Sequence, residues 1–138
     1  MLAEDNANDV ELTLTAFKEN MIINRVDVVR DGTEALDYLR YEGKFADRAK
    51  EVPVVILLDI KMPKKSGIEV LREIKADSEL KGIPVVMLTS SDMDKDIAEC
   101  YKLGVNAYVV KPVDFIEFAK TVKTLGLFWS VLNRTPSK

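Results

Sequence analysis

Asp59 is the residue of this sequence best suited to carry chemistry. It ends the apolar run at residues 54–58, and a run of this length is typical of a strand buried on both faces of a parallel sheet. The carboxyl end of such a strand is where open α/β sheets place their ligands. A carboxylate there is costly unless it is paired, bound to a metal or used in a reaction. Asp59 is therefore our candidate for the reacting group.

Four other polar residues stand in similar places along the sequence. Glu4 and Asp5 follow a short first apolar run, and Thr89 and Lys111 each end a later one. Because the carboxyl ends of parallel strands meet along one edge of a doubly wound sheet, we expect all four to converge with Asp59 in one crevice.

Three carboxylates in one crevice repel one another unless a cation lies between them. Mg²⁺ prefers oxygen ligands and usually takes one or two carboxylates beside several waters. Next to such an ion, Asp59 could act as a nucleophile toward phosphorus, as aspartates do in enzymes that form aspartyl phosphates. Thr89 would donate its hydroxyl to one phosphoryl oxygen, and Lys111 would pair with another. Positioning and charge stabilisation suffice for phosphoryl transfer, which suits a chain without histidine.

The elements that must position these residues alternate along the chain. Strand-like apolar runs occur at residues 26–29, 54–58, 83–88 and 107–110, after a first strand of only three residues, 1–3. Segments of helical period lie between and after them, with apolar faces made by Val10, Leu14, Phe17 and Met21; Leu36 and Leu39; Ile68, Leu71 and Ile74; Ile97 and Tyr101; and Phe115, Phe118, Val122 and Leu125. This alternation predicts an α/β fold with a parallel sheet and helices on both faces.

Length and composition fit one globular domain. The chain has 138 residues, of which 47% are hydrophobic and 31% charged, and its net charge of −3 gives no reason to expect nonspecific nucleic-acid binding. We find no run near the ~18 apolar residues of a membrane span and no signal peptide. The single cysteine, Cys100, excludes an internal disulfide, favours a cytoplasmic location and is expected to pack on a helix face. Residues 42–51 are charged and are predicted to form a solvated loop.

The sequence resembles the receiver domain of two-component response regulators over nearly its whole length. The matching stretches are Glu4-Asp5-Asn6; Leu58-Asp59-Ile60-Lys61-Met62-Pro63 with Gly67; Leu88-Thr89-Ser90; and Tyr108-Val109-Val110-Lys111-Pro112. The resemblance implies a flavodoxin-like (βα)5 doubly wound parallel sheet with strand order 2-1-3-4-5, in which the brief first strand is interior. It also implies a single receiver domain over residues 1–138, acting as a signalling switch and not as an enzyme.

By this resemblance, Asp59 accepts a phosphoryl group from the phosphohistidine of a partner histidine kinase. Glu4, Asp5, Asp59 and the main-chain carbonyl of Lys61 would hold Mg²⁺, and Thr89 and Lys111 would serve the phosphoryl group. Thr89 also resembles half of a switch pair. Its hydroxyl would move toward the phosphoryl group while the ring of the other half, Tyr108, turns inward.

The long connection before Asp59 and the pair Phe128-Trp129 resemble stand-alone regulators associated with bacterial phytochrome kinases. That resemblance implies a phytochrome-type kinase as partner, with output through a downstream protein or onward phosphotransfer in a phosphorelay. Residues 127–138 form an apolar extension that exceeds what one helix face needs, and they are a candidate homodimer contact.

Other interpretations stay open at this point. Taken singly, Glu4 and Asp5 could complement a helix dipole, Thr89 could cap a helix, and Tyr108 could be packing. The chain could also be an aspartate-nucleophile phosphatase on a similar fold, although those enzymes carry a second acid where this sequence has Lys61. A nucleotide or flavin carrier is a third interpretation, but the turn at residues 3–8 lacks the glycines that cradle phosphates.

Overall fold

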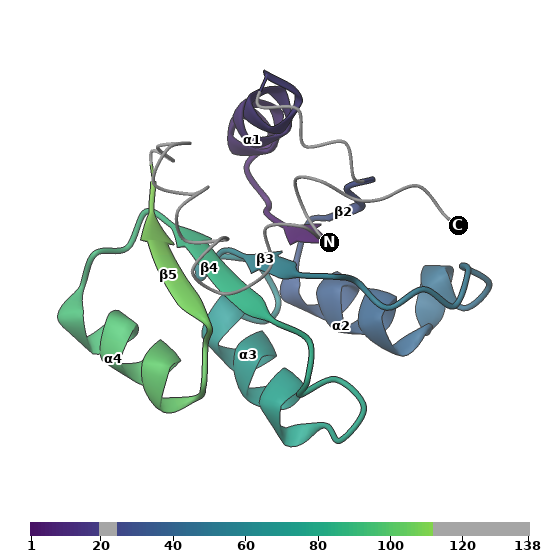
Figure 1. The fold of residues 1–138 in the computed structure, drawn as a ribbon. Coiled ribbons are helices and arrows are strands. Elements are labelled where there is room, and N and C mark those ends of the chain that lie inside the picture. The colour runs from purple at the N-terminus through teal and green to yellow at the C-terminus, as the bar shows by residue number, and fades with distance from the viewer. Residues whose placement is uncertain (20–24, 112–138) are drawn as a thin grey trace, which may run out of the picture.

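A computed structural model describes residues 1–19 and 25–111 of the chain (Figure 1). Its elements are β1 (Leu2–Ala3), α1 (Ala7–Glu19), β2 (Val28–Val29), α2 (Gly32–Arg40), the 3₁₀ turn η1 (Gly43–Phe45), β3 (Ile56–Leu58), α3 (Gly67–Ala76), β4 (Val85–Thr89), α4 (Asp94–Lys102) and β5 (Ala107–Val110). The last predicted helix and the extension at residues 127–138 lie outside the described residues. None of the described helices is long and apolar enough to cross a membrane.

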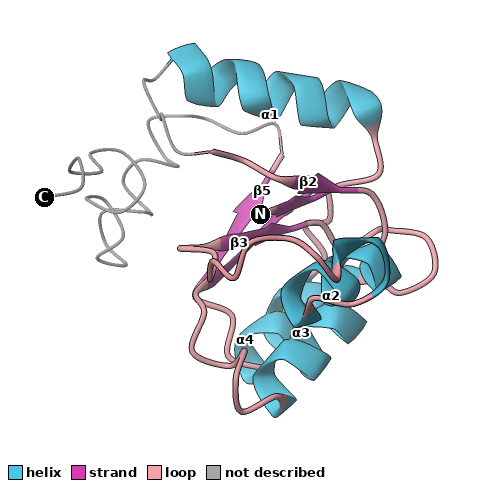
Figure 2. Cartoon of the chain, turned by 90° about the vertical axis from the view of Figure 1, so that its right-hand side faces the viewer, coloured by secondary structure: helices cyan, strands magenta, loops and turns pink. Residues whose placement is uncertain are grey.

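The five strands are parallel and form one sheet in the order β2-β1-β3-β4-β5. Helices α2, α3 and α4 cover one face of this sheet, and α1 covers the other (Figure 2). This arrangement confirms the predicted doubly wound, flavodoxin-like fold.

The brief first strand is interior, as the resemblance implied. Leu2 pairs with Val28 of β2 on one side and with Leu57 of β3 on the other, so β1 lies where the strand order changes direction. Ligands of open α/β sheets bind at this switch point, beyond the carboxyl ends of the strands. The fold therefore puts the residues that follow β1 and β3 at the place where a site is expected.

Apolar side chains on the two faces of the sheet form separate clusters. Ile56 and Leu58 pack with the helices α2, α3 and α4, whereas Leu57 between them packs on the opposite face with Phe17 of α1. Side chains of a strand alternate between its faces, so β3 is anchored from both sides. This double burial holds the end of β3, and Asp59 after it, in a fixed position.

Several predicted strand boundaries were wrong by one or two residues, and one predicted core residue is exposed. The run at residues 54–58 enters the sheet only at Ile56, and Val54 is 38% exposed. The pairing explains this, because the amide of Leu57 bonds to the carbonyl of Met1, the residue just before β1, and Leu57 is the first residue of β3 that pairs with β1. On α4, the predicted core residue Tyr101 is exposed, while Cys100 is fully buried as expected.

The connection at residues 42–51 is more than the solvated loop predicted from its charges. Its Arg48 guanidinium lies 3.8 Å from the ring centroid of Tyr38 and 4.1 Å from that of Tyr41. Arg48 Nε also donates to the Tyr38 carbonyl at 2.8 Å. Cation–π contacts of this kind favour arginine, and they pack the connection against the end of α2.

Candidate functional site

Asp59 lies directly after β3 and is only 6% exposed. Its amide donates to the Ala3 carbonyl of β1 at 3.1 Å, and its Oδ1 accepts from the amide of Lys61 at 3.3 Å. Helix α3 begins immediately beside it, since the amide of Gly67 donates to the Ile60 carbonyl at 2.7 Å. A Cβ on Gly67 would lie 2.0 Å from the Asp59 carbonyl oxygen, so only glycine permits this approach.

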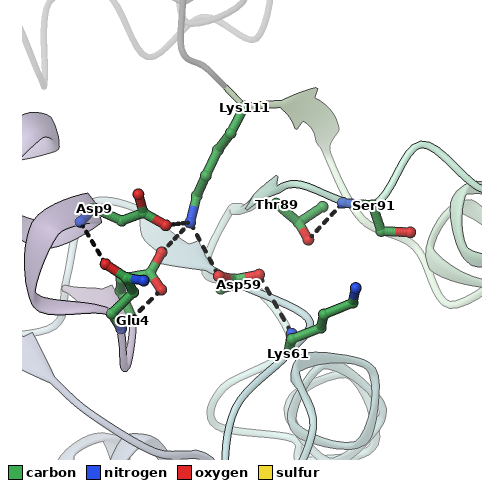
Figure 3. Close-up of polar contacts among 8 residues, drawn as sticks. Glu4, Asp9, Asp59, Lys61, Thr89, Ser91 and Lys111 are labelled. Carbon is green, nitrogen blue, oxygen red and sulfur yellow. Dashed lines mark hydrogen bonds and ion pairs between the residues drawn. The ribbon is translucent and has the colours of Figure 1, made fainter.

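Lys111 joins three carboxylates from distant parts of the sequence (Figure 3). Its Nζ lies 3.0 Å from Asp59 Oδ2 and 3.0 Å from Asp9 Oδ2, and it also bonds to Glu4 Oε1. The side chains of Lys111, Glu4 and Asp59 are 12%, 3% and 8% exposed. Charge-assisted bonds in such a desolvated place are strong, so they hold the ammonium at the site.

Glu4, Asp5 and Asp59 form a group of carboxylates in which one oxygen atom from each residue lies within 4.8 Å of those from the other two. Glu4 and Asp59 are buried, whereas Asp5 is exposed at the rim. Three carboxylates without a soft ligand among them suit a hard divalent cation. The donor set therefore fits the predicted metal site. The carbonyl of Lys61 stays a predicted fourth ligand.

The site contains more acidic groups than basic ones, because Lys111 contacts Glu4, Asp9 and Asp59. Burial and the nearby Asp59 raise the pKa of Glu4, the bond from Lys111 offsets part of this rise, and the net pKa is about 7. Burial alone would lower the pKa of Lys111, but its bonds to Glu4, Asp9 and Asp59 raise it above its ordinary value. One ammonium thus stays charged among an excess of acids, and this excess favours a further cation.

Thr89 and Tyr108 both form a hydrogen bond with Ser91. Thr89 is fully buried, and its Oγ1 accepts from the amide of Ser91 at 3.2 Å. The Tyr108 hydroxyl donates to the Ser91 carbonyl at 2.8 Å, and Ser91 Oγ donates to Asp96 Oδ2 at 2.6 Å. The connection from β4 to α4 is therefore held at Ser91, whose amide, carbonyl and hydroxyl all form hydrogen bonds.

Sequence reasoning missed Asp9 and Asp96. Asp9 follows Asp5 by about one helical turn, and that spacing was the only available signal that both face the site. Asn6 holds Asp9 and Glu4 in place, because its Oδ1 accepts from the amide of Asp9 at 3.0 Å and its own amide donates to Glu4 Oε2 at 3.2 Å. Nothing in the spacing of Asp96 distinguished it from other acids at a helix start.

A doubly wound sheet with a buried aspartate after β3, acids after β1 and a lysine after β5 defines a receiver-type phosphoacceptor domain. Comparison with known families agrees, since the response regulator receiver domain matches residues 1–123. The chain belongs to this family. It is a signalling family, so the comparisons give no support to the phosphatase and carrier interpretations.

Solved structures of response regulators, two of them described as phytochrome response regulators, are similar to this chain. The bacteriophytochrome response regulator RtBRR is 52% identical, with a TM-score of 0.86 over 98% of this chain and 81% of that one. The phosphorylated cyanobacterial phytochrome response regulator RcpA is 41% identical, with a TM-score of 0.75 over 99% and 96%. The Mn²⁺-bound form of Rcp1, a Synechocystis protein, is 36% identical, with a TM-score of 0.77 over 99% and 96%.

Proposed function

We propose that this chain is a switch that receives a phosphoryl group on Asp59 from the phosphohistidine of a partner histidine kinase. A carboxylate oxygen of Asp59 bonds to phosphorus while the phosphorus–nitrogen bond breaks, and the imidazole nitrogen keeps the electron pair. The observation that carries the proposal is the geometry of Asp59. Asp59 is buried, and the distance from its Oδ2 to Lys111 Nζ is 3.0 Å. It also belongs to a group of three carboxylates.

The residues around Asp59 would have different roles in the phosphoryl transfer. Lys111 already lies at the acid and would pair with a phosphoryl oxygen. Thr89 Oγ1 accepts from Ser91, which leaves its O–H as a donor to another phosphoryl oxygen. The amide of Lys61 orients the acid through Oδ1.

Mg²⁺ is the proposed cation, held by Glu4, Asp5, Asp59 and the carbonyl of Lys61. When bound, it would neutralise charge on the acids and on the incoming phosphoryl group. A divalent cation is supported by the clustered carboxylates and by the similar regulator Rcp1, whose structure is a Mn²⁺-bound form.

Phosphorylation adds roughly −1.5 to −2 charges and three acceptor oxygens to the site. If Thr89 moves its Oγ1 toward these oxygens, its bond with the amide of Ser91 breaks. The carbonyl of Ser91 accepts the hydrogen bond from Tyr108. When the connection between β4 and α4 moves, this bond is lost and the ring of Tyr108 is released. We propose that this coupled movement changes the surface that a downstream protein or a phosphotransfer protein recognises.

The decisive experiment incubates the chain with Mg²⁺ and acetyl phosphate and compares it with Asp59→Asn. We expect the parent alone to gain one phosphoryl group, which hydroxylamine removes as it does from acyl phosphates, and a chelator to prevent the gain. Phosphate on both chains, or steady turnover of many phosphomonoesters, would contradict the proposal.

The similar phytochrome-associated regulators support a phytochrome-type kinase as donor and, with it, a cytoplasmic location. Transfer from such a kinase should be faster than from an unrelated histidine kinase, and equal rates would contradict this part of the proposal.

Residues 127–138 are proposed as a homodimer contact because their sequence is apolar. Sedimentation of a chain ending at Gly126 tests this, because an unchanged dimer fraction would rule it out.

A further inference from the structure

Asp9 is a fourth carboxylate at the site, supplied by the first turn of α1. Its Oδ2 lies 3.0 Å from Lys111 Nζ, and its side chain is 36% exposed, against 12% for Lys111. The bond from its amide to Asn6 Oδ1 fixes the start of the helix. Figure 3 shows Asp9 and Glu4 approaching the ammonium from the same side, with Asp59 on the other.

The three partners of Lys111 differ in one respect. Glu4 and Asp59 also belong to the group of three carboxylates that suits a divalent cation, whereas Asp9 does not. Lys111 and a divalent cation therefore compete for the same two acids. Among the carboxylate partners of Lys111 in the described part of the chain, only Asp9 would not have to be shared.

We propose that Asp9 is a positioning residue that keeps Lys111 at the site when a divalent cation takes Glu4 and Asp59. A largely buried ammonium without a partner is strongly disfavoured. With Asp9 present, Lys111 loses two acids but retains a charge-assisted bond, so it stays beside Asp59 and the cation binds at a lower cost. This inference rests on the proposed function, in which the acidic group holds a divalent cation.

A simpler role for Asp9 would be to complement the dipole of α1, as acids in a first helical turn do. That role would affect the stability of the helix but would not depend on Lys111. A direct role as a metal ligand would also be independent of Lys111. The two alternatives can therefore be separated from the proposal by a double-mutant cycle.

The test measures binding of Mn²⁺ and of Mg²⁺ to the full chain by calorimetry. We expect Asp9→Asn to weaken binding about three- to tenfold in the parent and less than about twofold in a Lys111→Met background. Asp9→Glu, which keeps the carboxylate, should stay within about twofold of the parent. The control is Glu11→Gln, which removes an exposed charge from the same helix and should change the affinity less than about twofold.

Equal losses in both backgrounds, no loss in the parent, or a loss in Asp9→Glu as large as that in Asp9→Asn would each overturn the inference. Lys111→Gln provides the second background if the methionine variant does not fold. A parent chain that binds neither cation would overturn the proposed function itself. Normal binding with equal losses would overturn the role of Asp9 alone.

Discussion

The Tyr108 hydroxyl donates a hydrogen bond to the main-chain carbonyl of Ser91, and the two oxygen atoms lie 2.8 Å apart. The amide of the same residue bonds to Thr89 Oγ1. Thr89 and Tyr108, predicted to be a switch pair, are thus linked through one intervening residue. A movement of Thr89 would reach Tyr108 through the main chain of Ser91.

Tyr108→Phe removes the bond to Ser91 and keeps the ring. We expect the free energy of unfolding to fall by about 1 kcal/mol and the amide of Ser91 to exchange faster, because Ser91 loses one of the bonds that fix its main chain. Urea denaturation and amide hydrogen exchange measure these effects. The matched control is Tyr101→Phe on the exposed Tyr101, and equal effects of the two variants would contradict the role of the Ser91 bond.

Asp96→Ala should release the connection between β4 and α4 from the helix. Its Oδ2 accepts from Ser91 Oγ at 2.6 Å, and hydrogen bonds to charged groups contribute about 1.5–3 kcal/mol. Asp94 lies in the same first turn of α4, so Asp94→Ala removes an equivalent interaction with the helix dipole. We expect Asp96→Ala to lower the free energy of unfolding by about 1–2 kcal/mol more than this control. A smaller loss than in Asp94→Ala would show that the bond contributes nothing.

Much of the fold could be predicted because apolar runs and helical periods alternate clearly along the sequence. The strand order came from the family resemblance, since periodicity does not say which strands are neighbours. The errors have local causes. Val54 continues an apolar run, but the pairing of β3 with β1 begins only at Leu57. Tyr101 has the spacing of a core residue, yet the neighbouring Cys100 is the one buried.

The candidate site was predictable where residues end strands, because parallel strands finish along one edge of the sheet. Asp59, Glu4 and Lys111 meet there as expected. Asp9 and Asp96 belong to first turns of helices, where acids are common for their effect on the dipole alone. The contacts of Arg48 with Tyr38 and Tyr41 could not be predicted, because they depend on how the connection at residues 42–51 folds back onto α2.

Gly67→Ala should disturb the start of α3 next to the phosphoacceptor. The added Cβ would lie 2.0 Å from the Asp59 carbonyl oxygen, and that oxygen belongs to the backbone and cannot rotate away. We expect the free energy of unfolding to fall by about 2–3 kcal/mol, with slower phosphorylation because Asp59 shifts. Gly82 has open space around its Cβ position, so Gly82→Ala should change stability by less than about 0.5 kcal/mol. Similar losses in both variants, followed by thermal or urea unfolding, would contradict this account.

The thiol of Cys100 should be unreactive in the folded chain. Burial, together with the nearby Asp96 and Glu99, raises its pKa from 9.0 to about 11. The thiolate is the reactive form, so labelling by iodoacetamide at pH 8 should be far slower than in urea, where the thiol is exposed. Because the folded chain keeps a proton that the unfolded chain loses, this group stabilises the fold fully below pH 9, and that stabilisation is lost as the pH rises through about 11. Cys100 is the only cysteine, so the labelled fraction reports on it alone, and equal labelling rates with and without urea would contradict its burial.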